Sequence, residues 1–141
     1  MAVQLTAPEI AEKLDAVCIR RCVESEAFAK ICAAEKVLRE LAFITALPAG
    51  AVLAAQGHEA LPTAADAQVL VQGIADLVLV YPDHLELLDY KTDRRKTRAD
   101  FVRAYRAQLE LYAKAIDKRF APRRVTYKGI YSLELGELIK V

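Results

Sequence analysis

Residues 85–97, LELLDYKTDRRKT, place a mostly apolar run directly before a dense group of charges. The run ends at Asp89, Lys91 follows two positions later, and arginines begin soon after. Side chains of a strand alternate between its two faces, so Asp89 and Lys91 leave the same face. The stretch therefore predicts a buried strand that ends with an acid and a lysine side by side.

The segment before this strand predicts its partner. Residues 68–81, QVLVQGIADLVLVY, carry the strongest strand pattern in the chain, and residues 84–90 carry the next. The YPDH sequence between them is typical of a turn, so the two strands are expected to form an antiparallel hairpin. Such a hairpin would bring Asp76, the acid within the first apolar run, opposite a residue near Asp89 or Lys91.

Two carboxylates and a lysine at one end of a hairpin indicate a metal site that acts on phosphodiesters. Neighbouring carboxylates repel each other, and burial adds to the cost of keeping both ionised. A divalent cation removes this cost, and Mg²⁺ is commonly held by one or two carboxylates while it keeps several waters. A simpler interpretation stays open, because an acid and a lysine at alternate strand positions also form ordinary surface ion pairs that contribute little.

The remaining segments predict a mixed α/β domain with helices packed on a central sheet. Residues 47–66 contain prolines and glycines and are expected to be irregular, with a short strand at residues 51–55. The other expected elements are a helical region at residues 7–36, in which a second helix can begin at Ser25, a strand at 37–46, a helix at 98–118, and strands at 125–133 and 138–141.

Composition favours one folded domain. The chain has 141 residues, 55% of them hydrophobic and 28% charged. No apolar segment is long enough to span a membrane and no secretory pattern is present, so a cytoplasmic protein is expected. Cys18, Cys22 and Cys32 form no CxxC pair and are interpreted as reduced core residues rather than a metal site.

The formal net charge of +1 conceals a basic cluster. Its members are Lys91, Arg94, Arg95, Lys96, Arg98, Arg103 and Arg106, opposed only by Asp93 and Asp100. Positive side chains are unfavourable near a helix N-terminus, because the helix dipole there prefers anions. Their position favours another use, such as contact with a phosphate backbone, and no base-reading motif accompanies them.

Taken together, these motifs resemble the RecB-type nuclease domain of the PD-(D/E)XK superfamily. Gly73-x-x-Asp76, the DYKTD sequence of residues 89–93 and Gln108-x-x-x-Tyr112 carry the resemblance, and Arg39-Glu40-x-x-Phe43 adds to it. It covers roughly residues 36–132 and is nearest to the C-terminal nuclease domain of AddA-type helicase-nuclease subunits, which process double-strand DNA ends.

The resemblance implies a restriction-endonuclease-like αβββαβ core and a Mg²⁺-dependent deoxyribonuclease, an exonuclease, with Mn²⁺ as a possible substitute. Asp76, Asp89 and the backbone carbonyl of Tyr90 would bind the metal, and Lys91 would be the catalytic lysine. DNA-binding or supporting roles would fall to Thr92, Arg94, Arg95, Gln108 and Tyr112. The implied partners are DNA and an AddB-like nuclease subunit of the full-length protein.

Two departures from the family pattern predict that the chain is a fragment. The family takes a further metal ligand from a histidine on an upstream helix, whereas the first histidine here is His58, in the irregular segment. No GxxxxGK[ST] sequence is present, so no ATP site is expected. The cysteines precede the core, which argues against an iron–sulfur cluster. Residues 1–36 would then be N-terminal helices and residues 37–141 the nuclease core of a larger helicase-nuclease.

Two further functions remain open at this point. The chain could be a nuclease-like module that binds DNA or a partner subunit without cutting, although intact Asp76, Asp89 and Lys91 argue against a decayed site. It could also act on RNA, or as a stand-alone exonuclease.

Overall fold

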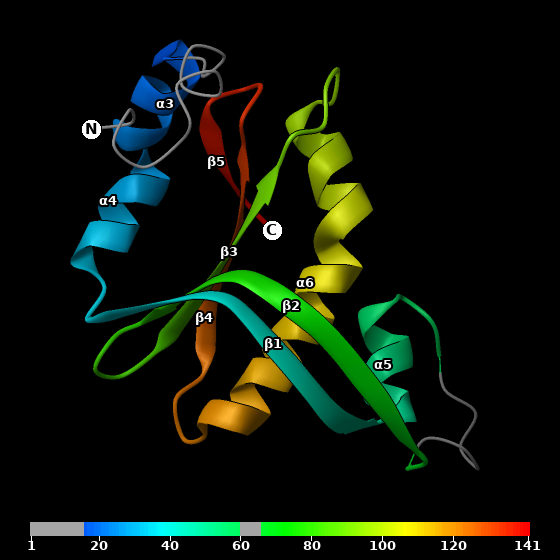
Figure 1. Cartoon of the computed structure of the whole chain (residues 1–141). Coiled ribbons are helices and arrows are strands. Elements are labelled where there is room, and N and C mark those ends of the chain that lie inside the picture. Colours follow the sequence, from blue (N-terminus) through cyan, green and yellow to red (C-terminus); the bar gives the residue numbers. More distant parts are fainter. Residues whose placement is uncertain (1–15, 60–65) are drawn as a thin grey trace.

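The computed structural model describes residues 16–59 and 66–141, and the expected first helical turns at residues 7–15 lie outside this part (Figure 1). In chain order the elements are α3 (Ala16–Val23), α4 (Glu26–Ala33), β1 (Lys36–Pro48), α5 (Ala49–Ala55), β2 (Gln68–Val80), β3 (Leu85–Lys91), α6 (Arg98–Phe120), β4 (Val125–Ser132) and β5 (Glu137–Lys140).

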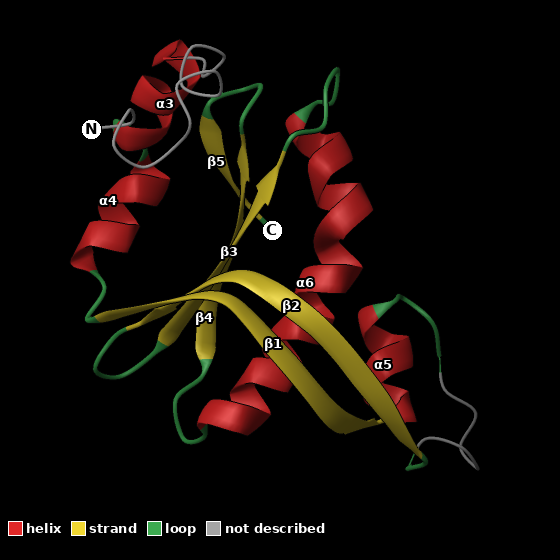
Figure 2. Ribbon diagram, in the orientation of Figure 1, coloured by secondary structure: helices red, strands yellow, loops and turns green. Residues whose placement is uncertain are grey.

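The strands form one mixed sheet in the order β1-β2-β3-β4-β5. β1, β2 and β3 pair antiparallel, β3 and β4 pair parallel across the α6 connection, and β5 returns antiparallel beside β4. α6 lies on one face of the sheet, and α3 and α4 lie on the other (Figure 2). The expected restriction-endonuclease-like α/β fold is confirmed, and the hairpin of β2 and β3 is present as the sequence indicated.

Helices on both faces explain why β3 and the second half of β2, from Ala75 to Val80, are almost continuously apolar; the first half of β2 is more exposed. On one face, Phe101 and Leu109 of α6 pack with Val78 and Leu87 of these strands. On the other, Leu79 belongs to a second buried cluster that also contains Ala27 of α4. A strand covered on both faces has no solvent side, so its sequence need not alternate between apolar and polar residues.

The regular pairing of β1 with β2 is interrupted at Glu40 and Asp76. The ladder pairs Arg39 with Leu77 and Leu41 with Ala75, and the pair between them is missing. Glu40 has a φ of 48°, the left-handed region that is uncommon for residues other than glycine. The register is the same on both sides of this gap, so no residue is inserted, and the irregularity sits beside the first motif carboxylate.

The structure corrects one expected element and confirms another. Residues 51–55 belong to helix α5 rather than to a strand, because the alanine-rich segment AGAVLAA has high helix propensity and no alternating pattern. The expected second helix does begin after Ser25, which caps α4 by accepting a hydrogen bond from the backbone N–H of Phe28. Within residues 16–59 and 66–141, no helix is long and apolar enough to cross a membrane.

Candidate active site

Asp76 and Asp89 meet where β2 and β3 stop pairing. The last ladder pair joins Leu77 to Leu88, and beyond it the Tyr90 backbone N–H donates to Oδ2 of Asp76 at 2.9 Å. The Asp76 side chain thus continues the strand pairing after the backbones separate. The hairpin register therefore places both motif carboxylates at the same end, as the sequence predicted.

Asp89 and Lys91 form a close ion pair on β3. Nζ of Lys91 lies 2.6 Å from Oδ2 of Asp89, and Asp89 is only 4% exposed. The ammonium of Lys91 therefore compensates the charge of the buried Asp89 carboxylate directly. A buried carboxylate that also lies beside a second acid, Asp76, is a natural ligand for a cation.

Burial dominates the electrostatics of this pair. It raises the pKa of the Asp89 carboxyl; the Lys91 ammonium offsets part of the effect, and the nearby Asp76 adds to it. For Lys91, burial by itself lowers the pKa, but the Asp89 carboxylate outweighs burial and the net pKa is raised. Lys91 is therefore held as an ammonium, while Asp89 would be further stabilised in its ionised form by additional positive charge.

The Lys91 ammonium also lies against an aromatic ring of α6. It is 4.5 Å from the centroid of the Tyr105 ring, within the range of a cation–π contact. The Tyr105 hydroxyl lies 2.9 and 2.8 Å from the two carboxylate oxygens of Asp93. Lys96 pairs with the same carboxylate at 2.5 Å, and these two contacts hold the pKa of Asp93 below its usual value, Lys96 contributing most. Asp93 thus ties the end of the DYKTD motif to α6.

Sequence reasoning did not single out Tyr105. The feature that could have identified Tyr105 is its spacing on α6. It lies one turn before Gln108 and two turns before Tyr112, so all three residues share one face of the helix. Tyr105 and Tyr112 both reach the sheet, by contacts with Lys91 and Phe43 respectively. Gln108 is half-buried on the same helix.

Gly73 leaves the space that Tyr112 occupies. The Tyr112 and Phe43 rings meet edge to face, with centroids 4.9 Å apart and planes at 82°. A Cβ atom on Gly73 would lie 2.8 Å from both rings. The glycine of the Gly73-x-x-Asp76 motif is therefore required by the close approach of α6 to β2, and Tyr112 packs where β1 and β2 pair rather than on the β2–β3 hairpin.

The structure separates Thr92, Arg94 and Arg95 from the carboxylates. Thr92 and Arg94 line a different hollow, next to α3 and Glu134. Arg95 is exposed with a φ of 59°, and its backbone N–H donates to Glu134 at 2.6 Å. DNA contact by these three residues stays a prediction.

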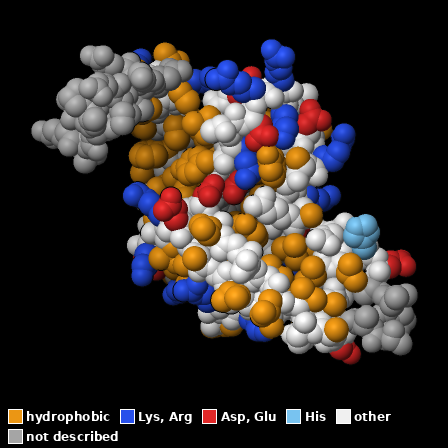
Figure 3. Space-filling model, turned by 45° about the vertical axis from the view of Figure 1, so that its right-hand side comes forward, with side chains coloured by type: hydrophobic (Ala, Val, Ile, Leu, Met, Phe, Trp, Pro, Cys, Tyr) orange, Lys and Arg blue, Asp and Glu red, His pale blue; other side chains and the backbone are white. Residues whose placement is uncertain are grey.

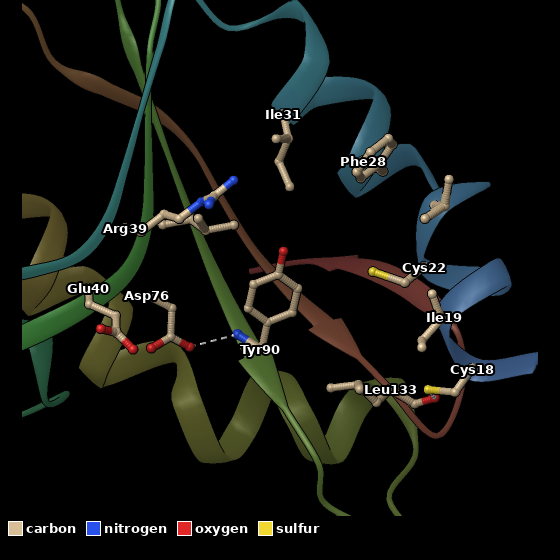
Figure 4. Close-up of a pocket in the computed structure, with 12 residues that line it drawn as sticks. Cys18, Ile19, Cys22, Phe28, Ile31, Arg39, Glu40, Asp76, Tyr90 and Leu133 are labelled. Carbon is tan, nitrogen blue, oxygen red and sulfur yellow. Dashed lines mark hydrogen bonds between the residues drawn. The ribbon is translucent and has the colours of Figure 1, made fainter. Parts of the chain in front are cut away.

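Glu40 joins the site although the sequence motifs gave it only a minor place. Its carboxylate and that of Asp76 point toward each other at one end of a hollow between α3, α4 and the sheet (Figure 4). The hollow has a volume of about 710 Å³; Cys18, Cys22 and Phe28 contribute to its mostly apolar lining, and Arg39 adds a positive charge. The only earlier signal was the Arg39-Glu40-x-x-Phe43 segment.

The residues present fit a divalent cation with few protein ligands. Asp76 and Asp89 supply carboxylates from neighbouring strands, and the two lie close enough for Asp76 to raise the pKa of Asp89. Mg²⁺ accepts such a site, because it is often bound by one or two carboxylates and keeps several waters. No group of three or more histidine, cysteine or acidic side chains arranged for a metal occurs in residues 16–59 and 66–141. His58, the first histidine of the chain, is exposed beyond the end of α5.

Comparisons with known proteins agree with this architecture. The family model of the PD-(D/E)XK nuclease superfamily matches residues 3–137. Two ATP-dependent helicase/nuclease subunits of the AddA type, from Ligilactobacillus salivarius and Desulforamulus reducens, are each 35% identical to the chain, over 74% and 79% of it. The protein of the same name from Lacticaseibacillus casei is 31% identical over 96% of the chain.

These matches cover 8%, 9% and 11% of the three relatives, so the chain spans about a tenth of their length. The family model, in contrast, extends over nearly the whole chain and over every strand of the sheet except β5, of which it reaches only the first residue. By sequence and by fold, this chain belongs to the PD-(D/E)XK nuclease superfamily.

Proposed function

We propose that this chain is a metal-dependent DNA nuclease domain that hydrolyses phosphodiester bonds during the processing of DNA ends for recombinational repair. The observation that carries the proposal is the meeting of Asp76, Asp89 and Lys91 at one end of the β2–β3 hairpin. The names of the relatives, which combine helicase and nuclease, support the biological setting.

Each residue of the site would have a distinct task. Asp76, Asp89 and the backbone carbonyl of Tyr90 would hold Mg²⁺, or Mn²⁺ in its place. A divalent cation bound there supplies Lewis acidity, which lowers the pKa of water and stabilises charge developing on a phosphate. Lys91 would place its ammonium against the attacked phosphate, and the ion pair with Asp89 keeps that ammonium protonated and oriented.

Glu40 is a further candidate for the metal site. Its carboxylate faces Asp76, and it could orient a water between them or add negative charge for the cation (Figure 4). The strained backbone at Glu40 supports a functional role, because strained residues concentrate at active sites.

The test is cleavage of labelled linear single- and double-stranded DNA with Mg²⁺, Mn²⁺ or EDTA. Wild type would be compared with Asp89→Asn, Lys91→Ala and the control Asp83→Asn, which alters an exposed turn carboxylate. We expect cleavage that requires metal, that is lost in the first two variants and that persists in the control. Cleavage that continues in EDTA or in Asp89→Asn would reject this site.

A non-catalytic DNA-binding module is the second candidate. It is favoured by one observation: among the described residues no three histidine, cysteine or acidic side chains are arranged to bind one metal ion directly, so Glu40 could serve the site only through a water or by its charge. A pure binder would show no cleavage with any metal, and would bind DNA equally well or better after Asp89→Ala removes a negative charge. A preference for RNA in the same assays would change the assigned substrate.

We also propose that the domain acts within a longer helicase-nuclease that pairs with an AddB-like subunit. The small share of each relative that the chain covers supports this arrangement. In it, residues 1–36 would form N-terminal helices and residues 37–141 the nuclease core. Co-purification of the full-length protein with its partner subunit would test the assembly.

A further inference from the structure

The basic residues around α6 divide into two groups. Lys96 pairs with Asp93, and Arg98 pairs with Glu137 on β5, so these two cations stabilise the fold. Arg103, Arg106 and Lys114 form neither an ion pair nor a side-chain hydrogen bond within residues 16–59 and 66–141, although Arg103 lies near enough to Asp100 to help lower its pKa. Cations without an internal partner are the ones available to an external anion.

These three cations line one concave surface. Together with the end of α5, from Ala54 to Gly57, they border a hollow of about 510 Å³. Glu110 also lies in this hollow, but its carboxylate pairs with Lys128 of β4. Among the described residues, the hollow therefore carries an excess of positive charge. We call it the α5–α6 groove, and Figure 1 shows the two helices side by side.

We infer that the α5–α6 groove binds the phosphate backbone of a DNA strand, with Arg103, Arg106 and Lys114 as its phosphate ligands. The inference rests on the proposed function, because the strand held there would be the one that reaches the carboxylate site. Guanidinium groups suit phosphate because their planar donors can bind two of its oxygens at once.

The groove lies within reach of the proposed catalytic centre. Arg106 follows Tyr105 directly on α6, and Tyr105 covers Lys91, so one end of the groove lies on the same helical turn as the ring that contacts the proposed catalytic lysine. Figure 3 shows acidic side chains near the middle of one face, with lysine and arginine side chains around them. Such an arrangement suits a backbone that approaches a metal site through positive surroundings.

The lining of the groove also indicates that it would not recognise base sequence. Its described residues are alanines, a glycine, a glutamine and the charged residues, with no aromatic side chain among them. These residues therefore cannot stack on bases, and their contacts to phosphate carry no sequence information. Binding through this groove would be independent of base sequence and strongly dependent on salt.

The experiment measures binding of a fluorescent single-stranded DNA oligonucleotide in EDTA, where no cleavage interferes, over a range of NaCl concentrations. The variant Arg103→Gln/Arg106→Gln/Lys114→Gln is compared with the control Arg20→Gln/Lys36→Gln/Lys140→Gln, which removes the same charge from exposed positions elsewhere. Circular dichroism verifies that both variants are folded.

Loss of three phosphate contacts should reduce the slope of log K against log[salt] by about 2, since each contact to a single strand contributes about 0.7. The same relation gives roughly 50-fold weaker binding at 0.15 M salt. The control should change both quantities much less. Equal losses in the two variants, no binding by wild type, or tighter binding of RNA than of DNA would each overturn the inference.

Cleavage assays separate this result from the proposed function. If wild type binds through the groove in EDTA but cuts nothing with Mg²⁺ or Mn²⁺, the nuclease assignment fails and the groove remains a DNA-binding surface. If wild type cuts DNA and the groove variant binds and cuts as the control does, the nuclease stands and the groove is rejected.

Discussion

The hydroxyl of Tyr105 lies 2.9 and 2.8 Å from the two carboxylate oxygens of Asp93, and this contact fixes the aromatic ring that faces Lys91. Asp93 is the last residue of the DYKTD motif and lies two residues after the end of β3, whereas Tyr105 belongs to α6. The pair therefore couples the docking of a helix to the orientation of the proposed catalytic ammonium. Lys91 is held from two sides, by the Asp89 carboxylate and by the Tyr105 ring.

Removal of the Tyr105 ring should slow cleavage more than removal of its hydroxyl. Tyr105→Phe keeps the ring, whereas Tyr105→Leu removes the cation–π contact, which is worth about 0.5–2 kcal/mol. We expect the kcat of Tyr105→Leu to fall by roughly 2- to 30-fold, at 1.36 kcal/mol per factor of ten, with little change in KM. Ring-current shifts of the Lys91 methylene protons in NMR spectra should persist in Tyr105→Phe and vanish in Tyr105→Leu. Unchanged shifts in the leucine variant would contradict the contact.

Metal binding should depend on pH through Asp89. Burial raises the pKa of Asp89, so the folded protein binds this proton more tightly than the unfolded chain does. In metal-free protein, stability contributed by this group therefore decreases as pH rises from the ordinary value of about 3.9 through the raised pKa. Mg²⁺ should reverse that loss, because it favours the carboxylate.

The measurement is the shift in Tm caused by Mg²⁺ as a function of pH. We expect the shift to be largest near neutral pH and to shrink as pH falls through the raised pKa of Asp89, where protons compete with the metal. Asp89→Asn should show a small shift at every pH. A Mg²⁺ effect of equal size in Asp89→Asn would place the metal elsewhere.

Substitution of Gly73 should destabilise the fold by crowding. A methyl group at this position would lie 2.8 Å from the Phe43 and Tyr112 rings. We expect Gly73→Ala to lower the free energy of unfolding by about 1–3 kcal/mol, as is usual for an overpacked core. Urea denaturation of Gly73→Ala, Tyr112→Ala and the double variant provides the check. The double variant should lose less than the sum of the single losses, and simple additivity would argue against the clash.

Glu40 should lower the free energy of unfolding while it increases the affinity for Mg²⁺. Glycine adopts a positive φ without the steric cost of a Cβ atom, so Glu40→Gly should relieve strain and raise the free energy of unfolding by about 1 kcal/mol. Glu40→Gln keeps the strain and removes only the charge. If the carboxylate serves the metal site, both variants should bind Mg²⁺ more weakly in calorimetric titrations. Wild-type affinity in both would assign the strain to the strand irregularity alone.

Local sequence was enough to indicate the β2–β3 hairpin and the three residues at its end. The two strands adjoin in sequence across a short turn, so their pairing and the alternation of side chains together placed Asp76 near Asp89 and Lys91. The start of α6 was likewise close to the position that its residues indicated, because Thr97 and Asp100 form a capping box.

Only the tertiary structure brought Glu40 to Asp76 and Tyr105 to Lys91. These contacts depend on the register between β1 and β2, which are separated by α5 and the segment after it, and on how α6 docks against the sheet. Neither follows from periodicity, since a strand or helix pattern defines a face but not what that face meets. The fold also separates the residues of the basic cluster, which are neighbours in sequence, into two groups with different surroundings. Some became structural ion pairs and others found no partner among the described residues, because partners such as Glu137 come from distant parts of the chain.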